Sequence, residues 1–217
     1  MWGGGSPCQS ISSLNIKGEG LEGKSGLFFE YVRVLKEINP TYFILENVRS
    51  SKLVKQTMDN YMGVEGVLIN SALVSYQIRN RYYWTNINIK PIVDKHISFQ
   101  DYKDEEYDSK LVVTRTPYHE EIIRNTLLNI RTQGLRMCYI IDKEDKIHCI
   151  KAVSSLSLAN VVKVGDWVRK LTRRELELAQ TLPVGYTDLL SYNLAQKAIG
   201  NGWTVDVIAH ILRCINE

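Results

Sequence analysis

The sequence predicts an α/β protein with a doubly wound sheet, because short apolar runs alternate with amphipathic segments. Residues 25–38 and 51–61 have the apolar spacing of helices. Residues 42–45 and 66–70 are short apolar runs of strand length, and residues 81–87 are rich in aromatic and β-branched side chains. Strands and helices that alternate in this way are typical of a sheet covered by helices on its faces.

A glycine-rich loop precedes these elements and carries a cysteine. Gly4 and Gly5 allow a sharp turn and a close backbone approach to a ligand, and Pro7 stiffens the loop. Cys8 is thereby presented as an attacking thiolate requires. A lone cysteine is more often a small buried hydrophobe, so this loop alone predicts little.

The strand at 42–45 ends in Glu46-Asn47-Val48. Open α/β sheets bind their ligands at the carboxyl ends of their strands, so Glu46 and its polar neighbour lie where a ligand would bind. A strand-end cap or an ordinary salt-bridge partner remains the alternative for this residue.

Two arginines follow at a spacing of two residues. We expect Arg79 and Arg81 to point the same way along a strand, and two guanidinium groups on one face suit a phosphate or a pyrimidine carbonyl. A solvated sheet face is the alternative. Gln77, two residues earlier, is expected to be structural.

The alternation stops near Pro91, and we expect residues 91–165 to form a separate small lobe. A polar, irregular stretch with an acidic run at 101–108 leads to a predicted helix at 117–132. Residues 137–141 and 147–151 are expected to form a hairpin. Residues 1–90 and 166–217 would then form the main domain.

The C-terminal part contains three expected helices. Thr172 and Glu175 have the spacing of a capping box and predict a helix that ends before Pro183. A short helix at 193–199 is expected to break at Gly200, and a final helix begins after Thr204, a candidate cap.

Composition restricts the class of protein without naming it. The chain has 217 residues and a net charge of +3, which permits nucleic-acid binding without requiring it. None of its four cysteines forms a Cys-x-x-Cys pair, so no metal site is predicted. The sequence has no apolar run near the roughly 20 residues of a membrane span, and we expect a cytoplasmic protein without a membrane partner.

Five motifs in order resemble those of the C5 DNA cytosine methyltransferases, with some likeness to phage, bacterial and de novo types. They are Pro7-Cys8-Gln9, Glu46-Asn47-Val48, Gln77-x-Arg79-x-Arg81, Arg169-x-Leu171-Thr172 through Gln180 and Pro183, and Gly200-Asn201. This resemblance implies a partial Rossmann-like methyltransferase sheet with a small mixed target-recognition lobe, acting on double-stranded DNA with S-adenosylmethionine.

The resemblance also implies roles for single residues. Cys8 would attack C6 of cytosine, Glu46 would stabilise charge at N3, Arg81 would lie near the target base, and Arg79 would support it. Residues that match cofactor-contacting positions are Pro7, Leu27, Asn201 and Trp203. Gln9 is a candidate for DNA contact. Basic residues of the small lobe are further candidates, namely Arg124, Arg131 and Arg136, although a solvated surface explains these arginines nearly as well.

The chain departs from this family at its start. It shows no Phe-x-Gly-x-Gly loop, and Met1-Trp2-Gly3 would be the last residues of the family's fourth strand. We therefore expect a fragment or subunit that needs a complementary N-terminal half. The alternatives are a catalytically inactive DNA-binding module or a degenerate remnant, and, more weakly, an unrelated thiol enzyme that pairs Cys8 with His96, His119 or His148.

Overall fold

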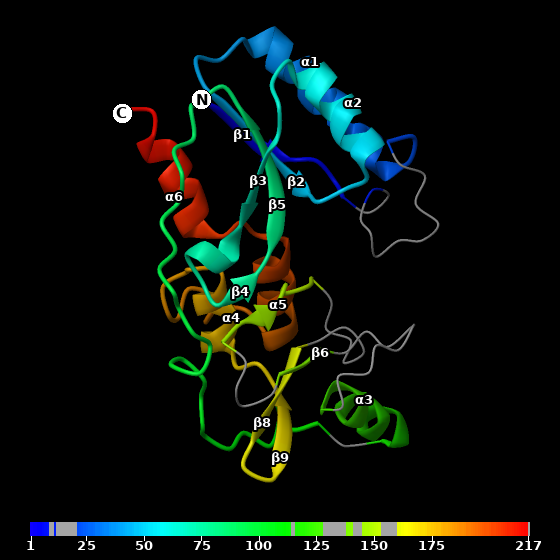
Figure 1. Ribbon diagram of the computed structural model, residues 1–217, viewed down its shortest axis with the longest axis vertical. Helices are drawn as coiled ribbons and strands as arrows, with labels where there is room; N and C mark the ends of the chain where they lie inside the picture. The colour runs from blue at the N-terminus through cyan, green and yellow to red at the C-terminus, as the bar shows by residue number, and fades with distance from the viewer. Residues whose placement is uncertain are drawn as a thin grey trace. The chain divides into compact units, whose positions relative to one another are not determined.

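A computed structural model describes residues 1–8, 11, 21–113, 116–127, 138–140, 145–152 and 160–216 (Figure 1). These residues pack into two compact units. The first contains the described parts of Met1–Asn70, Asn80–Pro91 and Ala209–Glu217, and the second contains those of Ser71–Arg79 and Ile92–Ile208. The division of the chain into parts 1–90, 91–165 and 166–217 stays a prediction.

A four-stranded sheet forms the centre of the first unit. Its strands are β1 (Trp2–Gly5), β2 (Phe43–Val48), β3 (Val67–Asn70) and β5 (Asn80–Thr85), in the spatial order β1-β2-β5-β3. β1 and β2 are parallel, whereas β5 lies antiparallel between β2 and β3. The predicted α/β class is confirmed, with the detail that β5 reverses direction inside the sheet.

Two helices lie side by side along this sheet (Figure 1). α1 (Leu27–Ile38) follows a 3-10 turn, η1 (Lys24–Gly26), and ends at Asn39, whose left-handed φ of 43° stops the helix. α2 (Lys52–Met62) begins at Ser51, whose hydroxyl accepts the Val54 amide. Side chains from both helices and from β2 and β5 form one apolar cluster, which includes Phe28, Val32, Phe43, Leu45, Met58, Met62 and Trp84.

Asp59 ties α2 to β5. Its Oδ1 accepts the indole N–H of fully buried Trp84 at 2.7 Å and the amide of Gly66 at 3.0 Å. Its Oδ2 accepts Lys55 Nζ at 2.7 Å. Burial alone would raise the pKa of Asp59, but these hydrogen bonds outweigh burial and lower that pKa. A carboxylate in this place therefore satisfies three donors at once.

The second unit contains two small sheets. One pairs β4 (Gln77–Ile78) in parallel with β7 (Ile147–His148). The other has the order β6-β8-β9, where β6 (Cys138–Ile140) is parallel to β8 (Asn160–Val164), and β8 is antiparallel to β9 (Trp167–Lys170). η2 (Ser71–Leu73) and α3 (Pro117–Leu127) complete this part.

The predicted hairpin at 137–151 is wrong. Its two halves pair with other strands. In β7, Ile147 is fully buried and its amide donates to Tyr76 O, so β7 pairs with β4. The hairpin of this lobe instead joins β8 and β9 at Gly165, whose φ of 56° suits a tight turn. The end of the predicted helix at 128–132 lies outside the described residues.

α4 (Arg173–Ala179) begins with the predicted capping box. The Thr172 hydroxyl accepts the Glu175 amide, and the Glu175 carboxylate accepts the Thr172 amide at 2.7 Å. The same carboxylate receives both terminal nitrogens of Arg169 at 2.7 and 2.8 Å, with both side chains fully buried. This bidentate pair fixes the end of β9 against α4.

A second buried carboxylate shapes the loop after α4. Glu177 accepts the Gly185 amide, the Thr187 amide and the Thr187 hydroxyl at 2.7, 2.8 and 2.6 Å. Burial alone would raise the pKa of Glu177, but these hydrogen bonds outweigh burial and lower it. Glu177 thus binds the loop at 183–190 at two residues, and Arg173 binds its end by donating to Leu190 O at 2.8 Å.

Two helices follow that loop. α5 (Tyr192–Asn201) is three residues longer than predicted, because it begins one residue earlier and continues through Gly200 to Asn201. α6 (Val205–Arg213) is the final helix. Within the part of the chain that the structure describes, no helix has the length and apolar character needed to cross a bilayer.

We predict that Asp59→Ala destabilises the first unit by about 2–3 kcal/mol, because the indole of Trp84 and the Gly66 amide lose their acceptor. Urea unfolding at pH 7 measures this change. Glu37→Ala is the control: it breaks an exposed ion pair with Arg33 and should change stability by less than about 0.5 kcal/mol. Equal effects of the two variants would contradict the role of Asp59.

We also predict that Glu177 makes stability depend on acid pH. A carboxyl group whose folded pKa is lowered stabilises the fold above its unfolded pKa, near 4.5, and this contribution disappears as pH falls through the folded value. Glu177→Gln should therefore be less stable than wild type at pH 7, and the difference should shrink towards pH 3. A difference in melting temperature that is constant with pH would refute this.

Candidate active site

The parallel pairing of β1 and β2 brings two predicted motifs together. In the register of this pair Gly5 lies opposite Glu46, so the loop with Cys8 leaves the sheet beside the Glu46-Asn47-Val48 end of β2. Both strands present their carboxyl ends here, where α/β sheets bind ligands. The Cys8 loop and Glu46 therefore share one edge of the first unit.

Asn47 joins the strand to the loop, a role that the sequence analysis missed. Its side chain is almost fully buried, and its Nδ2 donates to the Ser6 carbonyl at 3.2 Å and to Ser6 Oγ at 2.8 Å. The signal was present in the sequence, because an amide directly after a strand-end acid can hydrogen-bond a neighbouring loop. Asn47 thus fixes the backbone two residues before Cys8.

Cys8 is a free, half-buried thiol. Its side chain packs against the apolar cluster beneath α1 and α2, and its carbonyl accepts the Ile11 amide at 3.2 Å. Pro7 beside it is also half-buried, whereas Gln9 lies outside the described residues. The position of Cys8 fits a nucleophile on a turn, and its apolar contacts also fit a packing role.

Glu46 and Arg81 form an ion pair on one face of the sheet. Arg81 Nε lies 2.9 Å from Glu46 Oε1, and the two side chains are 15% and 12% exposed. Glu46 stands opposite Tyr83 and Arg81 opposite Val48, so the two charged residues are diagonal neighbours across antiparallel strands. The structure thus brings together two residues that were predicted to be catalytic. It also shows Glu46 as a salt-bridge partner, which was the alternative role expected for this residue.

The prediction that Arg79 and Arg81 share a strand face is wrong. Arg79 lies in the break between β4 and β5 and belongs to the second unit, where it is 3% exposed. Its guanidinium group donates to backbone carbonyls of the same unit, which include Gly202 O at 2.8 Å. Residues two apart share a face only within one continuous strand, and here the strand is interrupted at Arg79.

The predicted cofactor residues are distributed over both units. Leu27 is the first residue of α1 and is largely exposed. Asn201, also exposed, ends α5, and half-buried Trp203 follows in the turn before α6. Their donor set fits part of a nucleoside cofactor, because an aromatic ring and a free amide suit a base and its polar edge.

Few of the predicted DNA contacts lie in the described part of the chain. Arg124 is exposed on α3, while Arg131 and Arg136 are outside the described residues. A groove in the second unit is lined by residues of the acidic run at 101–108 and by cationic residues, among them Lys170 and Arg174. Because carboxylates and cationic side chains line it in equal number, this groove has no excess of positive charge that would favour DNA.

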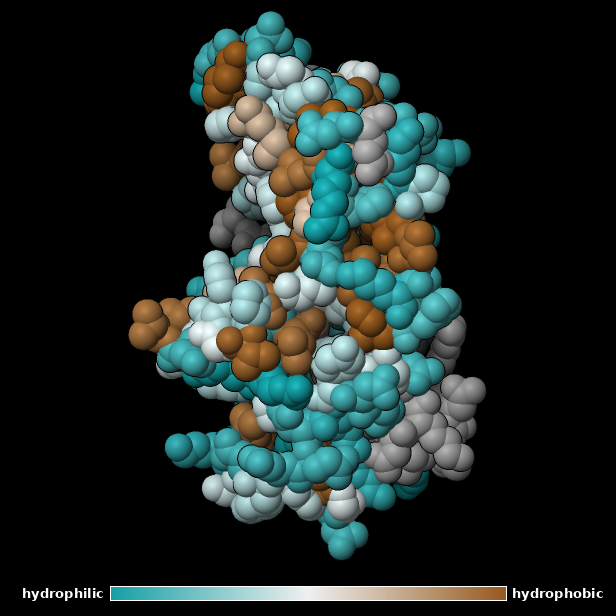
Figure 2. Space-filling view, turned by 90° about the vertical axis from the view of Figure 1, so that its left-hand side faces the viewer, coloured by the Kyte–Doolittle hydropathy of each residue, from teal (hydrophilic) through white to brown (hydrophobic). Residues whose placement is uncertain are grey.

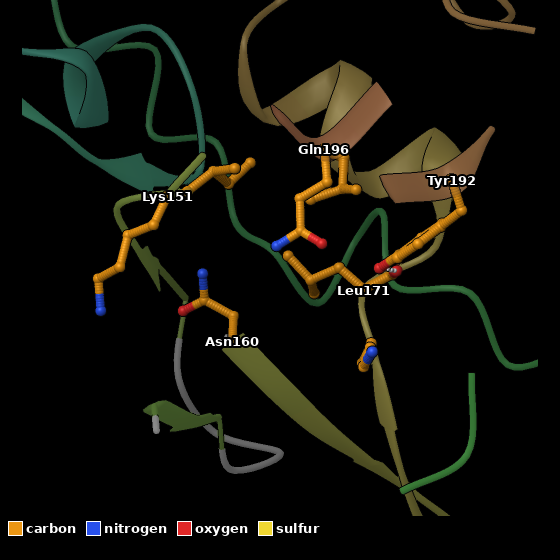
Figure 3. A pocket seen from close by; sticks show the side chains of 8 residues that line it. Lys151, Asn160, Leu171, Tyr192 and Gln196 are labelled. Atoms are coloured by element: carbon orange, nitrogen blue, oxygen red, sulfur yellow. Dashed lines mark hydrogen bonds between the residues drawn. The ribbon is translucent and has the colours of Figure 1, made fainter. Parts of the chain in front are cut away.

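A small cavity inside the second unit is lined by side chains from β8, α5 and the β9–α4 connection (Figure 3). Asn160 points towards it and donates through Nδ2 to His148 O at 2.9 Å, while the Tyr192 hydroxyl donates to Leu171 O at 2.8 Å. The space is close to that of one water molecule, too small for a cofactor. No cluster of metal ligands is present among the residues that the structure describes.

Comparisons with known proteins show what this chain is similar to. Residues 1–64 match the family described as C-5 cytosine-specific DNA methylase. The Type II methyltransferase M.HgiDI of Herpetosiphon aurantiacus is 24% identical over 94% of this chain and 69% of its own length. M.SsoII of Shigella sonnei is also 24% identical over 94% of this chain, but over 60% of its own length.

A solved structure resembles the fold as a whole. The Entamoeba histolytica methyltransferase EhMeth matches 99% of this chain and 76% of its own chain, with a TM-score of 0.69 and 15% sequence identity. The curated relatives are thus longer than the stretch they share with this chain. Residues 1–64 are thus similar to the C5 cytosine-specific DNA methylases, and most of the chain is similar to two type II methyltransferases. The likeness to EhMeth shows that the fold is shared.

Proposed function

We propose that this chain takes part in methyl transfer from S-adenosylmethionine to C5 of cytosine in DNA, through a covalent adduct of Cys8. The observation that carries the proposal is the shared edge of β1 and β2. There Asn47 fixes the loop that bears Cys8, and Glu46 is paired with Arg81 at the end of the neighbouring strand. This edge is where an α/β sheet binds its ligand.

Cys8 supplies the nucleophile in this proposal. Cytosine C5 becomes reactive only when a nucleophile adds at C6, and a thiolate is the strongest nucleophile among side chains at neutral pH. A bond forms between Cys8 Sγ and C6, and C5 then accepts a methyl group. Loss of the C5 proton to a base breaks the bond between sulfur and C6 and releases the thiolate. S-adenosylmethionine supplies the electrophilic methyl group when bound.

Glu46 and Arg81 would act on the base itself. The Glu46 carboxyl group would stabilise charge at N3 while the thiolate is bound at C6. Arg81 holds the Glu46 side chain at 2.9 Å and presents a guanidinium group suited to a pyrimidine carbonyl. The base must leave the duplex to reach such a pocket, as for other enzymes that modify bases.

Each unit carries residues that match cofactor-contacting positions of the family. Pro7 and Leu27 would offer apolar surface, and Asn201 and Trp203 would offer an amide and an aromatic ring. The described residues contain no Phe-x-Gly-x-Gly loop that would cradle the methionine part, so we propose that a complementary N-terminal half supplies it. β1 has one partner, β2, among the described strands, which leaves its other edge open for such a half.

The remaining parts of the proposal follow from the relatives. Their type II names support a role in modifying DNA within a restriction-modification system. Exposed Arg124, together with Arg131, Arg136 and Gln9, would contact double-stranded DNA. A cytoplasmic location would give access to that DNA.

We predict that the chain, combined with an N-terminal half from a relative, forms 5-methylcytosine in duplex DNA. Cys8→Ser should abolish product, and Glu46→Gln should slow its formation by about 10²-fold or more, the range of an acid–base group. Mass spectrometry of hydrolysed nucleosides measures the product. Cys214→Ala, which removes a buried thiol of the last helix region, is the control and should keep full activity.

Two outcomes would contradict this proposal. If folded Cys8→Ser still forms 5-methylcytosine at the wild-type rate, the assigned nucleophile is wrong. If the wild-type pair binds duplex DNA, with an affinity that falls steeply with salt, but forms no product, the chain is a DNA-binding module rather than a catalytic one.

A further inference from the structure

The turn between α5 and α6 is held by buried side chains from distant parts of the chain. This turn, residues 200–203, carries Asn201 and Trp203, the two residues that we propose contact the cofactor. All the contacts described below lie within the second unit. They come from Arg79, from Gln180 at the end of α4, and from the backbone at 151–152.

Arg79 binds the turn through its guanidinium group. Nη2 donates to Gly202 O at 2.8 Å and to Gly200 O at 3.3 Å, while Nη1 donates to Ile150 O at 3.4 Å. Carbonyls at the end of a helix carry partial negative charge, so they stabilise a buried cation. Arg79 is 3% exposed, which leaves little of its surface for a phosphate or a base.

Gln180 holds the same carbonyl from another direction. Its Nε2 donates to Gly202 O at 3.0 Å and to Ile199 O at 2.9 Å. The orientation of this amide is fixed because Oε1 accepts Gln77 Nε2 at 3.1 Å and Thr204 Oγ1 at 2.7 Å. The turn is therefore bound by two side chains whose own positions are determined.

Gly200 allows a third contact. A Cβ atom at this position would lie 2.5 Å from the Ala152 nitrogen and 2.6 Å from the Lys151 carbonyl carbon, distances that no side chain tolerates. The backbone at 151–152 therefore packs directly against α5, and only glycine fits at position 200. With Arg79 and Gln180, this contact restricts the turn to one conformation.

We propose that Arg79 is a positioning residue: with Gln180 it fixes the turn at 200–203, so that Asn201 and Trp203 meet the cofactor in one geometry. The inference rests on the proposed function, because the cofactor role of those two residues belongs to it. It replaces the expected role of Arg79 as the support of Arg81. Arg79 then acts on cofactor binding through the backbone, while Arg81 acts on the base.

The first test measures the turn itself and needs neither DNA nor cofactor. Arg79→Lys keeps the charge but loses the forked geometry, and hydrogen exchange of the peptide spanning 199–205 should accelerate about tenfold, while the α4 peptide is unchanged. Arg174→Lys, at an exposed arginine of the same unit that pairs with Asp104, is the matched control. Gln180→Met should loosen the same peptide. Unchanged exchange in both folded variants would overturn the proposal.

The second test measures the cofactor. With the N-terminal half present, Arg79→Lys should weaken S-adenosylmethionine binding about tenfold in equilibrium dialysis, with kcat at saturating cofactor within about threefold of wild type. Arg81→Lys should do the opposite, lowering kcat and keeping cofactor affinity. Faster exchange with unchanged cofactor affinity would overturn the positioning role. If the wild-type pair binds no cofactor, the proposed function fails, and the exchange test still decides whether Arg79 fixes the turn.

Discussion

The pairing of β1 with β2 is the contact on which the candidate site depends. These strands are parallel, and their register sets Gly5 opposite Glu46, so the loop that carries Cys8 starts at the level of the strand-end carboxylate. A register slip of one residue would turn Glu46 to the opposite face of the sheet. Asn47 secures the register at the loop by binding Ser6 with its side chain. The apolar cluster beneath α1 and α2 supports both strands from one face.

Charged side chains serve different purposes in the two units. Arg169 and Glu175 are fully buried and bind each other in a bidentate pair, and Arg79 is buried against carbonyls, so these charges hold the backbone. Glu46 and Arg81 pair at a strand end, and their side chains keep 12% and 15% of their surface exposed. Apolar residues also reach the surface of the molecule (Figure 2), and those of the second unit include Val184, Tyr186, Leu189 and Leu194. The loop that displays Val184, Tyr186 and Leu189 is ordered by Glu177.

Much of this fold could be predicted because its signals are local. The strand at 43–48, the helix that begins after Ser51 and the capping box of Thr172 each depend on neighbouring residues, and the structure confirms them. Pairings between distant segments could not be predicted. Nothing near Ile147 shows that it pairs with β4, and nothing near Arg79 shows that its partners lie at 200–202. The motifs predicted different roles for Arg81 and Arg79, but only the structure shows that Arg81 pairs with Glu46 while Arg79 binds backbone carbonyls of the second unit.

The central claim is that Cys8 is the nucleophile, and covalent trapping tests it most directly. Duplex DNA containing 5-fluorocytosine would be incubated with the chain, an N-terminal half and S-adenosylmethionine, because fluorine at C5 prevents the proton loss that frees the thiol. Peptide mass spectrometry of the adduct then identifies the attached residue. The account predicts one adduct, on the peptide that contains Cys8. An adduct on another cysteine, or methyl transfer to normal DNA without any trapped adduct, would contradict it.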